Sequence, residues 1–147
     1  MKIQPYLHFN GNCEEAFVFY EKALGGKILM TSRFKDLPEG GAGPEPGAAE
    51  AMRAVGEKIM HTRLQVGEQL LMGSDCHPLH PYHGIHGCSV AISVPDFATG
   101  QKVFDALSDG ANVDMPFGPA FWGDGFGMLT DKFGVPWMVN AGEKSPD

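Results

Sequence analysis

The chain has 147 residues, of which 43% are hydrophobic and 20% charged, as expected for a single globular domain with a real core. Its 18 acidic and 11 basic residues give a net charge of -7, which argues against nucleic acid and anionic membranes as partners. No apolar stretch approaches the roughly 18 residues that a membrane span needs.

The N-terminal segment and the cysteines indicate a cytoplasmic protein. Pro5 and His8 interrupt the apolar run of MKIQPYLHF, so no signal peptide is expected. The cysteines are Cys13, Cys76 and Cys88, an odd count that suits free thiols in a reducing compartment better than a disulfide framework.

Residues 3–9 are expected to form a short strand, with Pro5 near its start or on a sheet edge because proline has no N–H to donate. A helix should follow, with Asn12 as its N-cap and Glu15 completing a capping box. Gly25 supplies the left-handed residue that ends this helix. Its apolar stripe consists of Cys13, Phe17, Tyr20 and Leu24.

The rest of the first half reads as one long loop among strands. Residues 27–34 form an expected strand, and residues 38–56, rich in Gly, Pro and Ala, a loop with one helical turn around Ala48–Ala54. Residues 58–66 and 68–75 then read as two strands of a hairpin.

The segment 76–87 contains four histidines at every third position: His77, His80, His83 and His86. Its prolines and glycine forbid a regular helix, and polyproline II geometry would set the imidazoles on one ridge, roughly 9 Å apart. Ligands of one ion must converge to about 2 Å from it, so such a ridge cannot chelate by itself. We interpret the segment as a linker that could also bind metal adventitiously.

The second half repeats the order of elements. Residues 88–94 form an expected strand, and Asp96 caps a helix that runs to about Asp109, with Gly110 as its stop. The inward residues of that helix are Phe97, Phe104 and Leu107. Three extended segments complete the half: ANVDMPF, FGMLTD and PWMVNA.

The fold class that follows is α+β, with two βαβββ modules, about 1–75 and 88–142, joined by the linker 76–87. Each module is expected to form a curved sheet with its helix outside. Two such sheets set edge to edge would enclose a concave trough, and a trough is the default ligand site.

The segments PYLHFNGNCEEAFVFYEKALGG and FWGDGFGMLTDKFGVPWMVN resemble the PhnB-like branch of the vicinal-oxygen-chelate superfamily. This superfamily includes glyoxalase I, bleomycin-resistance proteins, fosfomycin-resistance enzymes and extradiol dioxygenases. The resemblance covers nearly the whole chain and implies the two-module fold. It does not fix the function.

The resemblance also implies where a divalent metal would be held by His, Gln or Glu side chains facing the trough. The matching positions of this chain are Pro5, Ser89 or Val90, Leu71 or Met72, and Met138. These side chains cannot ligate a hard or borderline ion well. No metal site is therefore predicted, although a divalent metal held by other residues stays open. His8 and His86 are the lesser candidates for such ligands.

Polar candidates for binding a small molecule lie in the first module. His61, Arg63 and Gln65 alternate along one strand and share a face that could orient an anion, or could simply be a solvated edge. His8 is expected to point toward the helix, because it lies an odd number of residues from Pro5. Asp75 is either a turn residue or a general base.

Aromatic candidates lie in the tail. Trp122 and Phe126, in the Gly-rich stretch FWGDGFG, and Trp137 could form aromatic walls of the trough. Trp122 could also stack on a flat ligand at the trough mouth; packing in a core or dimer interface is the alternative. Asp124 is a candidate polar contact.

Three functions remain open. The first is a small-molecule binding or enzymatic member of the superfamily with its pocket in the trough; as an enzyme it would be a metal-dependent lyase, transferase or dioxygenase with atypical ligands. The second is a metal-free module that sequesters a planar or aromatic ligand, as bleomycin-resistance proteins do. The third is a dimeric domain whose partner protein carries the activity. A homodimer is expected in each case, because each half-sheet leaves an edge to cover.

Overall fold

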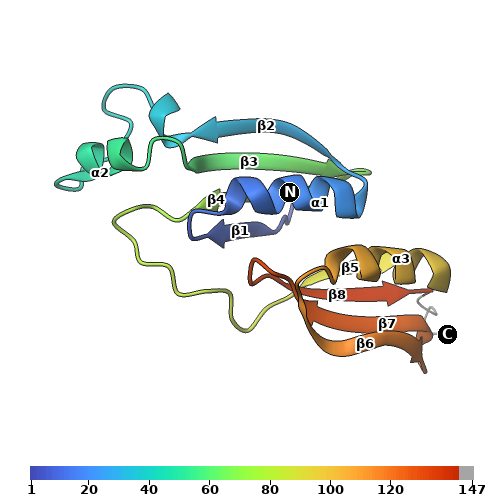
Figure 1. The fold of residues 1–147 in the computed structure, drawn as a ribbon. Coiled ribbons are helices and arrows are strands. Elements are labelled where there is room, and N and C mark those ends of the chain that lie inside the picture. Colours follow the sequence, from blue (N-terminus) through green and yellow to red (C-terminus); the bar gives the residue numbers. More distant parts are fainter. Residues whose placement is uncertain (143–147) are drawn as a thin grey trace. The chain divides into compact units, whose positions relative to one another are not determined.

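A computed structural model describes residues 1–142 of the chain. The described residues divide into two compact units, Met1–Gly84 (unit 1) and the residues from Ile85 onward (unit 2), each built on a four-stranded mixed sheet (Figure 1). None of the helices within the described residues is long and apolar enough to cross a membrane.

Unit 1 places one long helix on a sheet of strand order β1-β4-β3-β2. Strand β1 runs parallel to β4, and the other neighbours are antiparallel. The elements are β1 (Tyr6–Phe9), α1 (Cys13–Leu24), β2 (Lys27–Arg33), the 3-10 helix η1 (Phe34–Asp36), α2 (Ala48–Ala54), β3 (Ile59–Val66) and β4 (Gln69–Asp75). Pro5 precedes the edge strand β1, as predicted, and the helical turn over Ala48–Ala54 is confirmed.

Unit 2 repeats this topology with the strand order β5-β8-β7-β6. Here β5 runs parallel to β8, and the remaining pairs are antiparallel. The elements are β5 (Val90–Val94), α3 (Phe97–Leu107), β6 (Asn112–Ala120), β7 (Gly123–Thr130) and β8 (Pro136–Ala141). The predicted α+β class with two βαβββ modules is confirmed.

Helix α1 begins differently from the prediction. The Asn12 side chain makes no capping hydrogen bond, so the expected capping box with Glu15 is wrong. Instead, Asp75 Oδ1 at the end of β4 accepts hydrogen bonds from the backbone N–H groups of Gly11, at 2.8 Å, and Cys13, at 3.0 Å. The other end is as predicted, with Gly25 left-handed at φ +66°.

The core of unit 1 lies between α1 and the sheet. Cys13, Phe17 and Tyr20 are buried on the helix, and the Phe17 ring packs edge-on against Phe9 of β1. The ring also lies so close to β4 that a Cβ placed on Gly73 would be 2.6 Å from Phe17 Cε2. Glycine at this position therefore lets the helix approach the strand.

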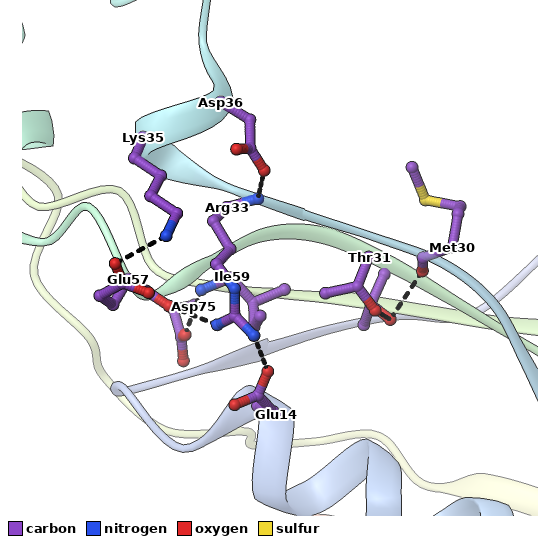
Figure 2. A network of polar contacts seen from close by, with 10 residues as sticks. Glu14, Met30, Thr31, Arg33, Lys35, Asp36, Glu57, Ile59 and Asp75 are labelled. Carbon is purple, nitrogen blue, oxygen red and sulfur yellow. Dashed lines mark hydrogen bonds and ion pairs between the residues drawn. The ribbon is translucent and has the colours of Figure 1, made fainter.

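Polar contacts connect the C-terminal end of β2, at Arg33, to the rest of unit 1. Arg33 forms an ion pair with Glu14 of α1 and donates to the Glu57 carbonyl at 2.6 Å, while Asp75 Oδ2 accepts from Ile59 N–H at 2.8 Å (Figure 2). These contacts join α1, β2, β3 and β4 at the end of the sheet where β4 stops.

Helix α3 of unit 2 is capped as predicted. Asp96 Oδ1 accepts the backbone N–H of Thr99 at 2.8 Å, and Phe104 and Leu107 are buried. Phe97 was expected to point inward but is 37% exposed, with its ring against Phe117 at a centroid distance of 5.0 Å. The helix ends at Leu107, two residues before Asp109.

Two segments that stood out in the sequence have definite local structure. The stretch FWGDGFG is mostly strand: Ala120 of β6 pairs with Gly123 of β7, so only Phe121 and Trp122 form the turn between them. The histidine segment is not a regular ridge, because the His80 N–H donates to the His77 carbonyl at 2.8 Å. That turn stacks the two imidazoles with centroids 4.4 Å apart, half the spacing of an extended chain.

Candidate functional site

The candidate site lies on the face of the unit 1 sheet opposite α1, called here the open face. Strand β3 is buried at Thr62 and Leu64, which face the helix, and the alternation therefore places His61, Arg63 and Gln65 on the open face. The predicted sharing of one face by these three side chains is confirmed.

Three of the side chains on this face form a hydrogen-bonded row. The His61 Nδ1 lies 3.1 Å from the Tyr6 hydroxyl, and Arg63 Nε donates to His61 Nε2 at 3.2 Å. The Tyr6 and His61 rings also stack, with centroids 5.6 Å apart and planes at 17°. Both Tyr6 and Arg63 pair with Met72 of the intervening strand β4, so sheet register brings the row together.

The row fixes the tautomer of the imidazole. Arg63 Nε can only donate, so His61 Nε2 must accept, and in the neutral ring the proton lies on Nδ1. That proton is donated to the Tyr6 oxygen, which leaves the phenol O–H to serve as a donor to another group. Burial, and secondly the charge of Arg63, lower the pKa of His61, so this neutral form prevails at neutral pH.

Arg63 keeps its charge uncompensated. Among the described residues no carboxylate pairs with its guanidinium, and its Nη groups enter none of the hydrogen bonds there. The open face thus offers a guanidinium and a phenol O–H to an oxygen of a bound molecule.

His8 lies on the open face too, which corrects the expectation that it points to the helix. In β1 the residues Leu7 and Phe9 are buried, whereas Tyr6 and His8 are exposed, with ring centroids 5.2 Å apart. Counting from Pro5 misled the prediction, because Pro5 lies before the strand and does not share its alternation.

Asp75 lies elsewhere. Its carboxylate is only 4% exposed, and it accepts the N–H groups of Gly11, Cys13 and Ile59. Burial and the neighbouring Asp75 charge raise the pKa of the Cys13 thiol, so Cys13 is an inert core residue. Asp75 therefore organises the fold of unit 1, and we leave it out of the open-face site.

In unit 2 the aromatic candidates separate into two groups. Trp122, in the β6–β7 turn, packs edge-on against Phe126 at 5.1 Å, and its Nε1–H donates to Asn140 Oδ1 at 3.0 Å. Trp137 is 1% exposed, and its Nε1–H donates to Asp131 Oδ2 at 2.8 Å. Trp122 and Phe126 thus form an accessible aromatic pair, whereas Trp137 belongs to the core.

Tyr6 and Asn140 were missed in the sequence. Each completes a hydrogen bond to a predicted residue on a different strand or turn, His61 and Trp122 respectively. The only signal was that Tyr6 lies two residues before His8 and shares its alternation. Finding the partner strand requires the register through Met72.

The residues at the metal-ligand positions implied by the family do not fit a hard divalent ion. Leu71 is buried toward the helix side, and Met72 and Met138 offer thioethers, which are soft and weak ligands. His61 already uses both ring nitrogens. Within residues 1–142, His, Cys, Asp and Glu side chains form no group of three suited to holding a metal.

Comparison with known proteins agrees with this architecture. The model of the Glyoxalase/Bleomycin resistance protein/Dioxygenase superfamily matches residues 2–139. Protein YjdN of Escherichia coli K12 is 30% identical over 146 residues, which cover 99% of each chain.

Solved structures are similar over the same span. Protein PA1353 from Pseudomonas aeruginosa is 46% identical, with a TM-score of 0.82 over 98% of this chain and 99% of that one. A PhnB protein from Bacillus cereus is 27% identical, with a TM-score of 0.71 over 96% and 99%. The chain belongs to the Glyoxalase/Bleomycin resistance protein/Dioxygenase superfamily, in its PhnB-like branch.

Proposed function

We propose that this protein binds a small organic molecule through the open face of unit 1, without the metal centre of its enzymatic relatives. The observation that carries the proposal is the row Tyr6–His61–Arg63. It holds a guanidinium in place without a carboxylate partner and directs a phenol O–H away from the imidazole. Such a pair of donors suits a ligand with an anionic or carbonyl oxygen.

The exposed rings on this face favour a ligand with a flat apolar part. Tyr6 is 40% exposed, and its ring lies 5.2 Å from that of His8 and 5.6 Å from that of His61, centroid to centroid. Aromatic side chains contribute large contact areas at small cost in side-chain entropy. Trp122 and Phe126 in unit 2 offer a second accessible aromatic surface of the same kind.

The test uses 8-anilino-1-naphthalenesulfonate, a fluorescent aromatic anion, titrated into the untagged full chain. We expect saturable binding that weakens about tenfold in Arg63→Met, which removes one charge-assisted contact. Tyr6→Phe, which keeps the ring, should weaken it less. Lys102→Met, which removes an exposed charge from α3 of unit 2, is the matched control.

Two outcomes would count against the proposal. Equal affinity of the wild type and Arg63→Met for the dye would show that the open face is not its binding site. One equivalent of tightly held divalent metal in untagged protein would instead support the metal-dependent lyase, transferase or dioxygenase. Cooperative urea unfolding of each variant establishes that the dye reports on folded protein.

We also propose a homodimer in the cytoplasm, with no nucleic acid or membrane partner. The edge strand β6 exposes Val113 and Met115, 42% and 47% respectively, and uncovered apolar edges favour pairing. The free thiols of Cys13, Cys76 and Cys88 suit a reducing compartment. Light scattering tests the dimer: Met115→Lys should shift the wild-type mass toward the monomer, and a monomeric wild type would exclude it.

A further inference from the structure

A pocket unrelated to the open face lies in unit 1, beyond the end of β4. Its volume is about 290 Å³, at the lower end of the range for ligand sites. The residues after β4 form one wall, and η1 with the loop between α2 and β3 forms another. The lining relevant here consists of Phe34, Val55, Lys58, Cys76, His77 and His80.

Lys58 is the charged group of this pocket. Its Nζ donates to the Gly11 carbonyl at 2.9 Å, and among the described residues it has no carboxylate partner. The Asp75 carboxylate also borders the pocket, but its oxygens already accept three backbone N–H groups. The pocket lining therefore holds one ammonium and one buried carboxylate, and of these two groups only Lys58 can donate hydrogen bonds to a bound anion.

The histidines add donors to this charge. The backbone N–H of Leu79 donates to His77 Nδ1 at 3.1 Å, so the proton of the neutral ring lies on Nε2. A ring in that tautomer offers an N–H and is not set up to ligate a metal through Nε2. His80 stacks on His77, and its Nε2 contacts Glu45 Oε1 at 3.2 Å, which holds the pair of rings in place.

The rest of the lining is apolar or unreactive. Phe34 is buried, and Val55 and the prolines beside the histidines add further apolar surface. Burial, and secondly the charge of Asp75, raise the pKa of the Cys76 thiol, so Cys76 stays protonated. The pocket combines the Lys58 ammonium, the buried Asp75 carboxylate, one imidazole N–H and an apolar wall.

We propose that this pocket binds a small carboxylate or phosphate monoester with an apolar body, whose anionic oxygens are held by Lys58 Nζ and His77 Nε2. The histidine segment then serves as the wall of a second ligand site in addition to linking the two units. The volume limits the ligand to one about the size of a single substituted ring.

The experiment follows the histidine ring signals of the full-length protein by NMR while benzoate, phenyl phosphate or neutral benzamide is added. We expect the anions to shift His77 and His80, leaving His8 and His61 as reporters of the open face. Benzamide, which has the shape of benzoate without its charge, should bind about tenfold more weakly. The relative affinities of benzoate and phenyl phosphate distinguish the two anion classes.

Three variants make the result decisive. Lys58→Met should weaken benzoate about tenfold, and Val55→Trp should block it by filling the pocket without a change of charge. Lys102→Met on α3 should leave it unchanged. Benzamide binding as tightly as benzoate, or shifts at His77 and His80 that persist unchanged in Lys58→Met, would overturn the proposal, as would the absence of any saturable shift at His77 and His80.

Discussion

Asp75 Oδ1 lies 3.0 Å from the backbone nitrogen of Cys13, so a strand residue caps a helix that begins 62 positions earlier in the chain. The same carboxylate accepts from Ile59 at the start of β3. Three segments distant in sequence thus meet at one buried anion. The structural role of Asp75 follows from this geometry.

Replacing Asp75 should destabilise the protein strongly. Asp75→Ala leaves three backbone N–H groups without their acceptor, and we expect the free energy of unfolding to fall by about 3 kcal/mol. Asp96→Ala is the matched control: it removes the exposed cap of α3 and should cost clearly less than Asp75→Ala. Urea titration measures both, and equal losses would show that the buried carboxylate has no special weight.

Local patterns in the sequence were sufficient to predict most elements of the fold. The helical stripe through Phe17 and Tyr20, the stop at Gly25 and the cap at Asp96 all depend on neighbours within a few residues. The cap of α1 does not, because its acceptor comes from β4. A local capping signal at Asn12 was therefore outcompeted by a buried carboxylate that only the tertiary fold supplies.

For the candidate site too, local sequence patterns predict one part and not the other. The shared face of His61 and Arg63 follows from strand alternation, which is local. The bond from His61 to Tyr6 depends on β1 pairing with β4 and β4 with β3, and no local pattern encodes that register. The prediction that His8 points toward the helix was wrong for a related reason, since side-chain alternation begins only where the strand begins.

The lowered pKa of His61 predicts a pH dependence of stability. Burial and the Arg63 charge oppose protonation in the folded state, whereas the unfolded imidazole titrates near its usual value of about 6.5. As the pH falls below that value, the unfolded chain takes up the proton first. His61 should therefore contribute its full share to the free energy of unfolding above about pH 6.5, and this contribution should be lost as the pH falls toward the folded-state pKa of His61.

Melting temperatures between about pH 7 and 5 test this. His61→Gln cannot titrate, but its amide can still accept from Arg63 and donate to Tyr6, so its melting temperature should fall less over the range. In Arg63→Met, an NMR titration of His61 should give a higher pKa than in the wild type. An unchanged titration would mean that burial alone sets the value.

Gly73 should not tolerate a side chain. A Cβ there would be 2.6 Å from the Phe17 ring and 3.0 Å from the Leu7 carbonyl oxygen, so Gly73→Ala should destabilise the protein by about 1–3 kcal/mol. Gly118→Ala is a matched strand substitution in unit 2, where a Cβ meets nothing within 4 Å. It should leave stability nearly unchanged by urea titration.

A second substitution distinguishes a steric clash from a backbone effect. Phe17→Leu shortens the side chain that faces Gly73, so in the double variant the Gly73→Ala substitution should cost less than it does beside Phe17. Additive losses in the double-mutant cycle would show that the ring is not the cause.

The two tryptophans should report on different environments. Trp122 is 37% exposed in the β6–β7 turn, whereas Trp137 is buried in the core of unit 2. In Trp137→Phe, the remaining emission comes from Trp122 and should be quenched efficiently by iodide, an ion that cannot enter the core. In Trp122→Phe, the emission of Trp137 should resist iodide.

The stability of the two variants should differ in the same direction. Trp137→Phe loses a buried hydrogen bond to Asp131 and part of its packing, which should lower the free energy of unfolding by about 2–3 kcal/mol. Trp122→Phe loses an exposed bond to Asn140 and should cost less than about 1 kcal/mol. Equal iodide quenching of both folded variants would contradict the assignment of Trp122 to the surface and Trp137 to the core.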